Sequence, residues 1–225
     1  MGNIWYLSPS NQSANVGIGT YGTEQEQMYL LMGEISPHLD RAGVSFCVPE
    51  RNTSLAQRVA ESNNMGAVFH LALHSNAGGN GKAWGPVGLY YSDAGKAMCE
   101  RLVDALLALG QKNNRSNNCV QRIDLYELRK TKAPAALLEV DFHDSAVGAA
   151  FITQRRREIA EAIARVIIAA DGKTFVPVTA GEYRDRAVDM GLFPTDTRWN
   201  EPMTREEAAA LAVKLTELWH GEVKK

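Results

Sequence analysis

The first 172 residues alternate between short apolar runs and longer stretches in which apolar residues recur at helical spacing. The apolar runs end in turn-forming residues and predict buried strands at 3–7, 44–48, 67–74, 87–92 and 135–142. The helical spacing predicts helices over 23–42, 54–62, 93–112 and from about 146 to a glycine stop at 171–172. Strands that alternate with helices predict an α/β fold, a mostly parallel twisted sheet flanked by helices on both faces.

The segment "VFHLALHSNA" (68–77) carries two histidines four residues apart. On a helix His70 and His74 would lie about 6 Å apart and could share a metal, whereas on a strand about 13 Å of backbone separates them. Apolar residues occupy both parities of this segment, which predicts a strand covered on both faces. We therefore expect no shared metal. His74 is placed at the carboxyl end of the strand, where open α/β sheets bind ligands, and His70 in the core or behind the site.

Further polar candidates fall at other strand ends. Residues 10–12 (Ser-Asn-Gln) follow the first strand, Glu24 opens the first helix, and Glu139 lies inside the apolar run "LLEV". Burying an unpaired carboxylate is unfavourable by several kcal/mol, so Glu139 should lie near a cation or have a raised pKa for acid–base work. The alternatives are a structural pair of Glu139 with Arg129 or Lys130, and a solvated first-turn carboxylate at Glu24.

The composition adds mainly exclusions. A net charge of −2 gives no electrostatic reason to expect nucleic acid or an anionic membrane as a partner. Three scattered cysteines suggest neither a disulfide framework nor a zinc knuckle. No apolar stretch approaches the roughly 18 residues of a membrane span. These features are those of an ordinary globular protein.

Four segments in order carry a family resemblance: "IWYLSPSNQ…YGTEQEQM", "FHLALHSNAGG", "GLYYS" and "LYELRKTKAPAALLEVDFHDS". Over residues 3–170 the chain resembles the zinc-dependent N-acetylmuramoyl-L-alanine amidases with a type 3 catalytic domain. The resemblance implies a zinc ion (Zn2+) at the strand ends, held by a His after strand one, a Glu opening the next helix and the His of "HSNA". It also implies a catalytic Glu base in "LLEV".

Three of these positions match directly. His74 corresponds to the "HSNA" ligand, Glu139 to the base, and Glu24 to the helix ligand. Gln25 and Glu26 lie close to Glu24 and could take its place, but Glu26 stands three residues after Thr23 and is expected to complete a capping box. That assignment leaves Glu24 as the free ligand.

The first ligand departs from the family pattern, because no histidine occurs in residues 1–37. At this place the chain has Ser10-Asn11-Gln12, which resembles a variant branch of the family. The amide oxygen of Gln12 could ligate zinc there, as a neutral and weaker ligand than imidazole. Three possibilities stay open: zinc held by Gln12, Glu24 and His74; help from a further group such as His143; or low metal affinity.

Three further residues are expected around the site, in substrate binding or in support of the ligands. Asn76 follows His74, and His143 follows Glu139. Arg129 could meet a carboxylate of the stem peptide or be an exposed charge at the rim.

Residues 173–225 differ in character from the domain predicted for 1–172. A short helix, a turn-rich stretch and a helix with Thr204 as N-cap resemble a single S-layer-homology unit. The resemblance implies binding of a secondary cell-wall polymer. A docking or homodimer element is the alternative reading.

The leading hypothesis is a peptidoglycan hydrolase that cleaves the amide bond between N-acetylmuramic acid and L-alanine. The start "MGNIWYLSPS" lacks a basic n-region and an apolar h-region. This favours a phage or prophage endolysin, made in the cytoplasm without a signal peptide and acting on the wall after release; a host autolysin is the alternative. Two other functions stay open: a non-catalytic wall-binding protein on the same scaffold, and a zinc peptidase that cuts the stem peptide.

Overall fold

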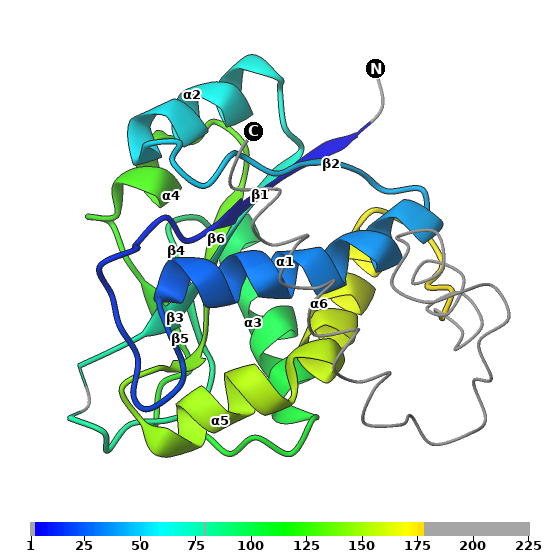
Figure 1. Ribbon diagram of the computed structural model, residues 1–225. Helices are drawn as coiled ribbons and strands as arrows, with labels where there is room; N and C mark the ends of the chain where they lie inside the picture. Colours follow the sequence, from blue (N-terminus) through cyan, green and yellow to red (C-terminus); the bar gives the residue numbers. More distant parts are fainter. Residues whose placement is uncertain (1–2, 79, 178–225) are drawn as a thin grey trace, which may run out of the picture. The chain divides into compact units, whose positions relative to one another are not determined.

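The computed structural model describes residues 3–78 and 80–177 (Figure 1). The chain divides into two compact units, Met1–Val176 and Pro177–Lys225. The S-layer-homology-like module predicted for 173–225 lies, from residue 178 onward, outside the described residues and stays a prediction. In the described part of the chain, no helix is long and apolar enough to cross a membrane.

A six-stranded sheet forms the centre of the first unit. In chain order its strands are β1 (Ile4–Pro9), β2 (Ser45–Cys47), β3 (Phe69–Asn76), β4 (Val87–Tyr90), β5 (Cys119–Gln121) and β6 (Ala135–Phe142). The spatial order is β2-β1-β3-β6-β4-β5. Every neighbouring pair is parallel except β4 with β6. The prediction of a mostly parallel sheet is therefore confirmed.

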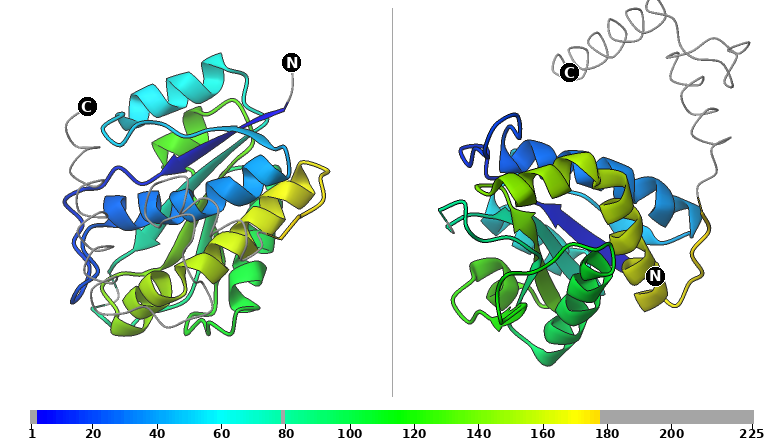
Figure 2. Two further views of the ribbon diagram at one scale, coloured as in Figure 1. Left: turned by 45° about the vertical axis from the view of Figure 1, so that its right-hand side comes forward. Right: turned by 90° about the horizontal axis from the view of Figure 1, so that it is seen from below.

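Helices cover both faces of the sheet, as predicted. They are α1 (Glu24–Arg41), α2 (Leu55–Asn64), α3 (Asp93–Leu107), α4 (Tyr126–Lys130), α5 (Ala146–Gln154) and α6 (Arg156–Ala170). The larger core packs α1, α3, α5 and α6 against one face, with α1 and α6 side by side (Figure 2). Helices α2 and α4 cover the other face, where Leu128 of α4 packs on Ala72 and Leu137. Side chains alternate along each strand, so neighbouring residues of β3 and β6 belong to different faces.

Four details differ from the sequence prediction. The three-residue strand β5 and the short helix α4 were not predicted, because neither is long enough to show a periodicity. The helix predicted over 93–112 ends at Leu107. The helix predicted from 146 is two helices, broken at Arg155, whose backbone is not helical (φ −114°, ψ 22°). The break lets α5 cover the end of β6, where a Cβ on Gly148 would collide with the carbonyl oxygen of Phe142.

The predicted capping box at the start of α1 is present. The Thr23 side chain accepts a hydrogen bond from the backbone N–H of Glu26, and the Glu26 carboxylate accepts one from the Thr23 N–H. The first turn of α1 is thereby fixed at the carboxyl end of β1, and Glu26 is committed to it. Glu24, the first residue of the helix, is left free to contact side chains at the carboxyl ends of the strands.

Candidate active site

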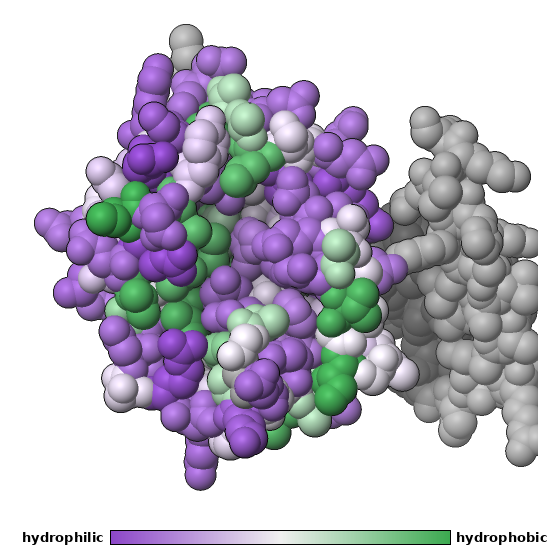
Figure 3. Space-filling view, turned by 90° about the vertical axis from the view of Figure 1, so that its left-hand side faces the viewer, coloured by the Kyte–Doolittle hydropathy of each residue, from purple (hydrophilic) through white to green (hydrophobic). Residues whose placement is uncertain are grey.

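His74 and Glu139 lie opposite each other at the carboxyl ends of β3 and β6. They are Cα partners in the parallel register, so their side chains share one face, the face that α2 and α4 cover. The register shifts immediately after this pair, between His74 and Asn76. An irregularity of this kind changes the direction of the following side chains and ends regular pairing. Figure 3 views this edge from outside and shows a hollow with apolar and polar side chains along its walls.

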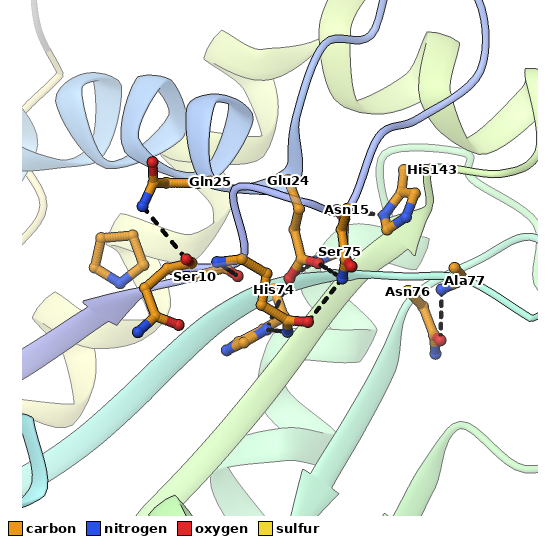
Figure 4. Close-up of polar contacts among 12 residues, drawn as sticks. Ser10, Asn15, Glu24, Gln25, His74, Ser75, Asn76, Ala77 and His143 are labelled. Atoms are coloured by element: carbon orange, nitrogen blue, oxygen red, sulfur yellow. Dashed lines mark hydrogen bonds and ion pairs between the residues drawn. The ribbon is translucent and has the colours of Figure 1, made fainter. Parts of the chain in front are cut away.

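Glu24 reaches the same point from the N-terminus of α1 (Figure 4). Its Oε1 atom is 2.8 Å from Nδ1 of His74 and 3.4 Å from the backbone nitrogen of Ser75. The neighbouring Gln25 is turned away and donates to the carbonyl oxygens of Asn11 and Arg51. Of the three adjacent candidates, Glu24 is thus the one that meets His74.

Gln12 also converges on His74, from the loop after β1. Its Nε2 atom lies 3.2 Å from Nδ1 of His74. Asn15 joins the two loop ends, because its Nδ2 atom donates to Oε1 of Gln12 at 2.7 Å and to Oε2 of Glu24 at 2.8 Å. Asn15 was not predicted as a site residue, because an amide in a polar, glycine-rich loop is also typical of an ordinary turn.

Glu139 has the environment expected of an acid–base group. Burial raises its pKa to about 7; the positive charges of His74 and Arg122 work against this rise, and the charge of Glu24 adds to it. Its Oε2 atom is buried without a hydrogen-bond partner. Within residues 3–78 and 80–177 Glu139 forms no ion pair with Arg129 or Lys130, so the structural alternative does not hold there.

The pKa values of His74 and Glu24 shift in opposite directions. Burial alone would lower the pKa of His74, but the hydrogen bond to Glu24 and the charges of Glu139 and Glu24 raise it overall. Burial alone would raise the pKa of Glu24, but the contacts with His74, Asn15 and Ser10 lower it overall. The site therefore favours positive charge between the two side chains, whether a proton or a metal ion carries it.

His70 has a separate role on the same strand. It is fully buried, and its Nε2 atom is 2.8 Å from Oε1 of Glu127 on α4. The same carboxylate accepts a 2.7 Å hydrogen bond from the hydroxyl of Ser8, and buried Arg58 donates to that hydroxyl in turn. The expectation of a core histidine is confirmed, whereas its partner Glu127 was not predicted.

The three supporting candidates lie at different places. Asn76 is at the end of β3 and uses Oδ1 to accept from the backbone of Ala77. His143 is buried and hydrogen-bonds through Nδ1 to the hydroxyl of Ser75, so it supports the strand end from behind rather than facing His74. Arg129 is exposed on α4. The structure thus brings Gln12, Glu24, His74 and Glu139 together, with His143 behind them.

Glu24, His74 and Gln12 together suit a divalent metal ion, provided that the side-chain amide of Gln12 serves as a ligand. Among the described residues, no three His, Cys, Asp or Glu side chains are grouped so as to hold a metal ion. A carboxylate and an imidazole nitrogen, from Glu24 and His74, are both common zinc ligands, and Gln12 is the third side chain within reach. The unpartnered oxygen of Glu139 beside them is suited to receive a proton. The residues present therefore fit an open site with one neutral ligand.

Solved structures with this fold are amidases from several bacteria. The catalytic domain of CwlV, an N-acetylmuramoyl-L-alanine amidase from Bacillus (Paenibacillus) polymyxa var. colistinus, superposes with a TM-score of 0.67 at 20% identity, over 76% of this chain and 99% of that one. AmiC2 of Nostoc punctiforme, another N-acetylmuramoyl-L-alanine amidase, gives 0.64 at 22% identity, over 75% and 96%. The catalytic domain of the CD27L endolysin, which targets Clostridia difficile, gives 0.62 at 21% identity, over 75% and 98%.

The sequence itself matches one family model. No curated protein matches the chain. The model described as N-acetylmuramoyl-L-alanine amidase matches residues 15–169, which is more than half of the chain and includes Glu24, His74 and Glu139. Gln12 lies before the matched segment. With the fold, the strand-end site and this match together, the chain belongs to the N-acetylmuramoyl-L-alanine amidase family.

Proposed function

We propose that the protein is a zinc-dependent enzyme that hydrolyses the amide bond between N-acetylmuramic acid and L-alanine in peptidoglycan. The observation that carries this proposal is the register of β3 and β6, which sets His74 directly beside Glu139 while Glu24 and Gln12 meet at His74. The family is generally zinc-dependent, and the donor set fits such an ion. We assign Gln12, Glu24 and His74 to the metal and Glu139 to proton transfer.

The metal supplies one kind of chemistry: bound at these residues, a zinc ion would polarise the scissile carbonyl and lower the pKa of water to about 7. Glu139 takes a proton from the attacking water while the water oxygen forms a bond to the amide carbon. The C–N bond breaks, and Glu139 delivers the proton to the leaving amine of L-alanine. The products are a lactyl carboxylate on the glycan and a free stem peptide, and Glu139 returns to its starting state.

The raised pKa of Glu139 suits both halves of this cycle. A base whose pKa is near 7 accepts a proton during attack and gives it up during amine departure without a large free-energy cost in either direction. This use in proton transfer also accounts for an unpaired carboxylate at a buried position, where its burial raises the pKa. A protein that only binds cell wall has no use for such a destabilising group, so we rank the non-catalytic alternative second.

Mass spectrometry of digested peptidoglycan tests the proposal. The protein is incubated with purified sacculi with and without a chelator, beside the Glu139→Gln variant and an exposed control, Glu158→Gln. We expect free stem peptides that begin with L-alanine, lost on chelation, restored by zinc, unchanged in the control and reduced about 10²- to 10⁴-fold in Glu139→Gln. Cuts within the stem peptide would identify a peptidase instead, and wall binding without any cut would identify a binding protein.

The biological setting that we propose is a phage or prophage endolysin, with a host autolysin as the alternative. The support is the likeness in fold to the catalytic domain of an endolysin. Expression inside a bacterium with a susceptible wall, with and without an agent that permeabilises the membrane, tests the setting. We expect lysis only after permeabilisation; lysis without it would point to export and to an autolysin.

A further inference from the structure

We propose that Asn15 is the positioning residue of the metal site: its side-chain amide clamps Gln12 and Glu24, from the two ends of the β1–α1 loop, into one ligand pair. This inference rests on the proposed function, because it concerns the site to which we assign zinc. It adds a residue outside the ligand set, and it explains how a glutamine can stand where the family pattern has histidine.

The backbone of the loop first brings Asn15 beside Glu24. Val16 and Thr23 form an antiparallel bridge, and the N–H of Gly17 donates to the carbonyl oxygen of Gly22 at 3.0 Å. Next to this bridge, the backbone N–H of Glu24 donates to the carbonyl oxygen of Asn15 at 2.9 Å. The loop therefore closes as a small hairpin at the N-terminus of α1, and Asn15 lies across from the first residue of that helix.

The side chain of Asn15 then makes two contacts from one atom. Its Nδ2 carries two hydrogens. The structure uses one for Oε2 of Glu24 at 2.8 Å (Figure 4) and the other for Oε1 of Gln12 at 2.7 Å. A residue with only one donor hydrogen could hold only one of these partners. Both distances are those of good hydrogen bonds, and the bond to the carboxylate is charge-assisted.

The Glu24 carboxylate determines which group donates and which accepts in these hydrogen bonds. An ionised carboxylate only accepts, so Asn15 must turn Nδ2 rather than its oxygen toward Glu24. The same nitrogen faces Gln12, which must therefore offer Oε1 to it and turns Nε2 toward His74. The hydrogen bond to Glu24 thus determines which atom of the Asn15 and Gln12 side-chain amides is nitrogen and which is oxygen.

The clamp leaves the ligand atoms free. Asn15 binds Oε2 of Glu24, whereas Oε1 is the atom that lies 2.8 Å from Nδ1 of His74. Gln12 can ligate a metal only through Oε1, because the Nε2 atom that lies nearer to His74 is a donor; Oε1 has a second lone pair beyond the one that Asn15 uses. A flexible, neutral glutamine is a weaker ligand than imidazole and loses more rotamer freedom when it binds, so its affinity depends strongly on being held in place beforehand.

Metal affinity of the full-length chain tests the clamp without relying on activity. The metal-free wild type, Asn15→Ala and Asn15→Leu compete with a chromophoric chelator for Zn2+, and Co2+ loading is followed by visible absorption. We expect both variants to bind 10- to 100-fold more weakly, the size of effect that partners of metal ligands have. Asn15→Ser keeps one donor hydrogen and should bind with intermediate affinity.

The control is Asn11→Ala, in the same loop. Its Nδ2 donates to the carbonyl oxygen of Thr53 at 3.1 Å, away from Glu24 and Gln12, so it reports on loop perturbation alone. We expect its affinity and Co2+ spectrum to match the wild type. Thermal unfolding of each metal-free variant within a few degrees of wild type establishes that the fold is retained.

Asn15→Leu gives the sharpest outcome, because leucine is neutral, has about the size of asparagine and has no donor hydrogen. If Asn15 acts by donating to Gln12 and Glu24, the affinity of Asn15→Leu should fall as far as that of Asn15→Ala. Wild-type affinity in Asn15→Leu would mean that the bulk of the side chain matters and not its hydrogen bonds, and it would overturn the clamp. Wild-type affinity in Asn15→Ala would overturn the clamp while leaving the proposed function intact. A wild type that binds neither ion would instead overturn the metal site on which the proposed function rests.

Discussion

His70 and His74 lie on the same strand and the same face, and each lies 2.8 Å from a glutamate oxygen, yet the two pairs have different surroundings. The His70–Glu127 pair is sealed between the sheet and α4, with side-chain exposures of 0% and 6%. The His74–Glu24 pair is at the strand end, where the histidine side chain is 14% exposed. Two positions four residues apart on one strand are thus a core position and a position at the carboxyl end of the strand.

The pairs also differ in what completes them. Glu127 also accepts a hydrogen bond from Ser8, to which Arg58 donates in turn, so the carboxylate of the inner pair has several partners, while Nδ1 of His70 is buried without one. The outer pair is surrounded by neutral amides and by Glu139, which has a buried oxygen without a partner. A buried carboxylate with several hydrogen-bond partners serves structure, whereas a carboxylate with an unpartnered oxygen beside a histidine at a strand end is typical of a site that takes a ligand.

Replacing each of the two histidines in turn by alanine has the largest expected effect. His74→Ala should reduce amidase turnover on the order of 10³-fold, because one of three metal ligands is lost. The buried Glu24 keeps its hydrogen bonds from Asn15 and from the Ser75 N–H, so the free energy of unfolding should fall by only about 1 kcal/mol. His70→Ala should keep zinc binding and lower that free energy by about 2–3 kcal/mol, since a buried carboxylate loses its partner. Turnover, chelator competition and urea unfolding measured on both variants separate the two roles. Equal loss of zinc in both would abolish the distinction.

Glu127→Ala should have the largest effect on stability. Removing this carboxylate leaves the buried hydrogen-bonding groups of His70 and Ser8 short of a partner, so we expect the free energy of unfolding at pH 7 to fall by about 3–5 kcal/mol. Urea unfolding measures this loss, with Glu100→Ala as the matched control, because Glu100 is an exposed residue of α3 that forms an ion pair with Lys96. A loss below about 1 kcal/mol would show that the inner pair is not what holds α4 to the sheet.

The pH dependence of that loss has a definite sign. Burial alone would raise the pKa of Glu127, but the hydrogen bond and charge of His70 lower it below the usual range. The ionised carboxylate therefore stabilises the fold above the unfolded-state pKa, near 4.5, and this contribution disappears as the pH falls below it. The difference between wild type and Glu127→Ala should shrink in acid.

Glu139 should show the opposite pH behaviour. Its pKa is raised to about 7 in the fold, so the folded state binds the proton more tightly than the unfolded chain does. Its ionisation destabilises the fold as the pH rises from about 4.5 to 7 and fully so above 7. In metal-free protein, Glu139→Gln should match wild type at pH 4 and be about 3 kcal/mol more stable at pH 8. An equal difference at both pH values would mean that Glu139 does not ionise in this window.

Much of the outer site could be predicted because its determinants are local. The two parities of apolar residues around His74 predicted a strand and excluded a shared metal. The spacing of Thr23 and Glu26 committed Glu26 to the helix cap and left Glu24 for the site. Glu139 was identified as a charge inside an apolar run. Each of these inferences needs only a few neighbouring residues.

The inner network could not be predicted because its contacts are distant in sequence. Ser8 and Glu127 are 119 residues apart, and α4, which carries Glu127, is too short to show a helical pattern. The antiparallel direction of β4 depends on how β5 and the loops around it pack, which no short window of residues encodes. Asn15 was missed for a different reason: its role depends on a loop that folds back on α1.

Zinc itself should distinguish the two pairs by a smaller but specific effect. A ligand that binds only the folded state at 100 times its Kd stabilises it by about 2.7 kcal/mol, so zinc should raise the thermal midpoint of wild type by several degrees. Glu127→Ala unfolds at a lower temperature but should show the same zinc-induced rise, because the inner pair does not contact the site. His74→Ala should show no rise at any zinc concentration that wild type resolves. If Glu127→Ala also lost the rise, the two pairs would be coupled along β3, and the outer ligands would depend on the inner network for their position.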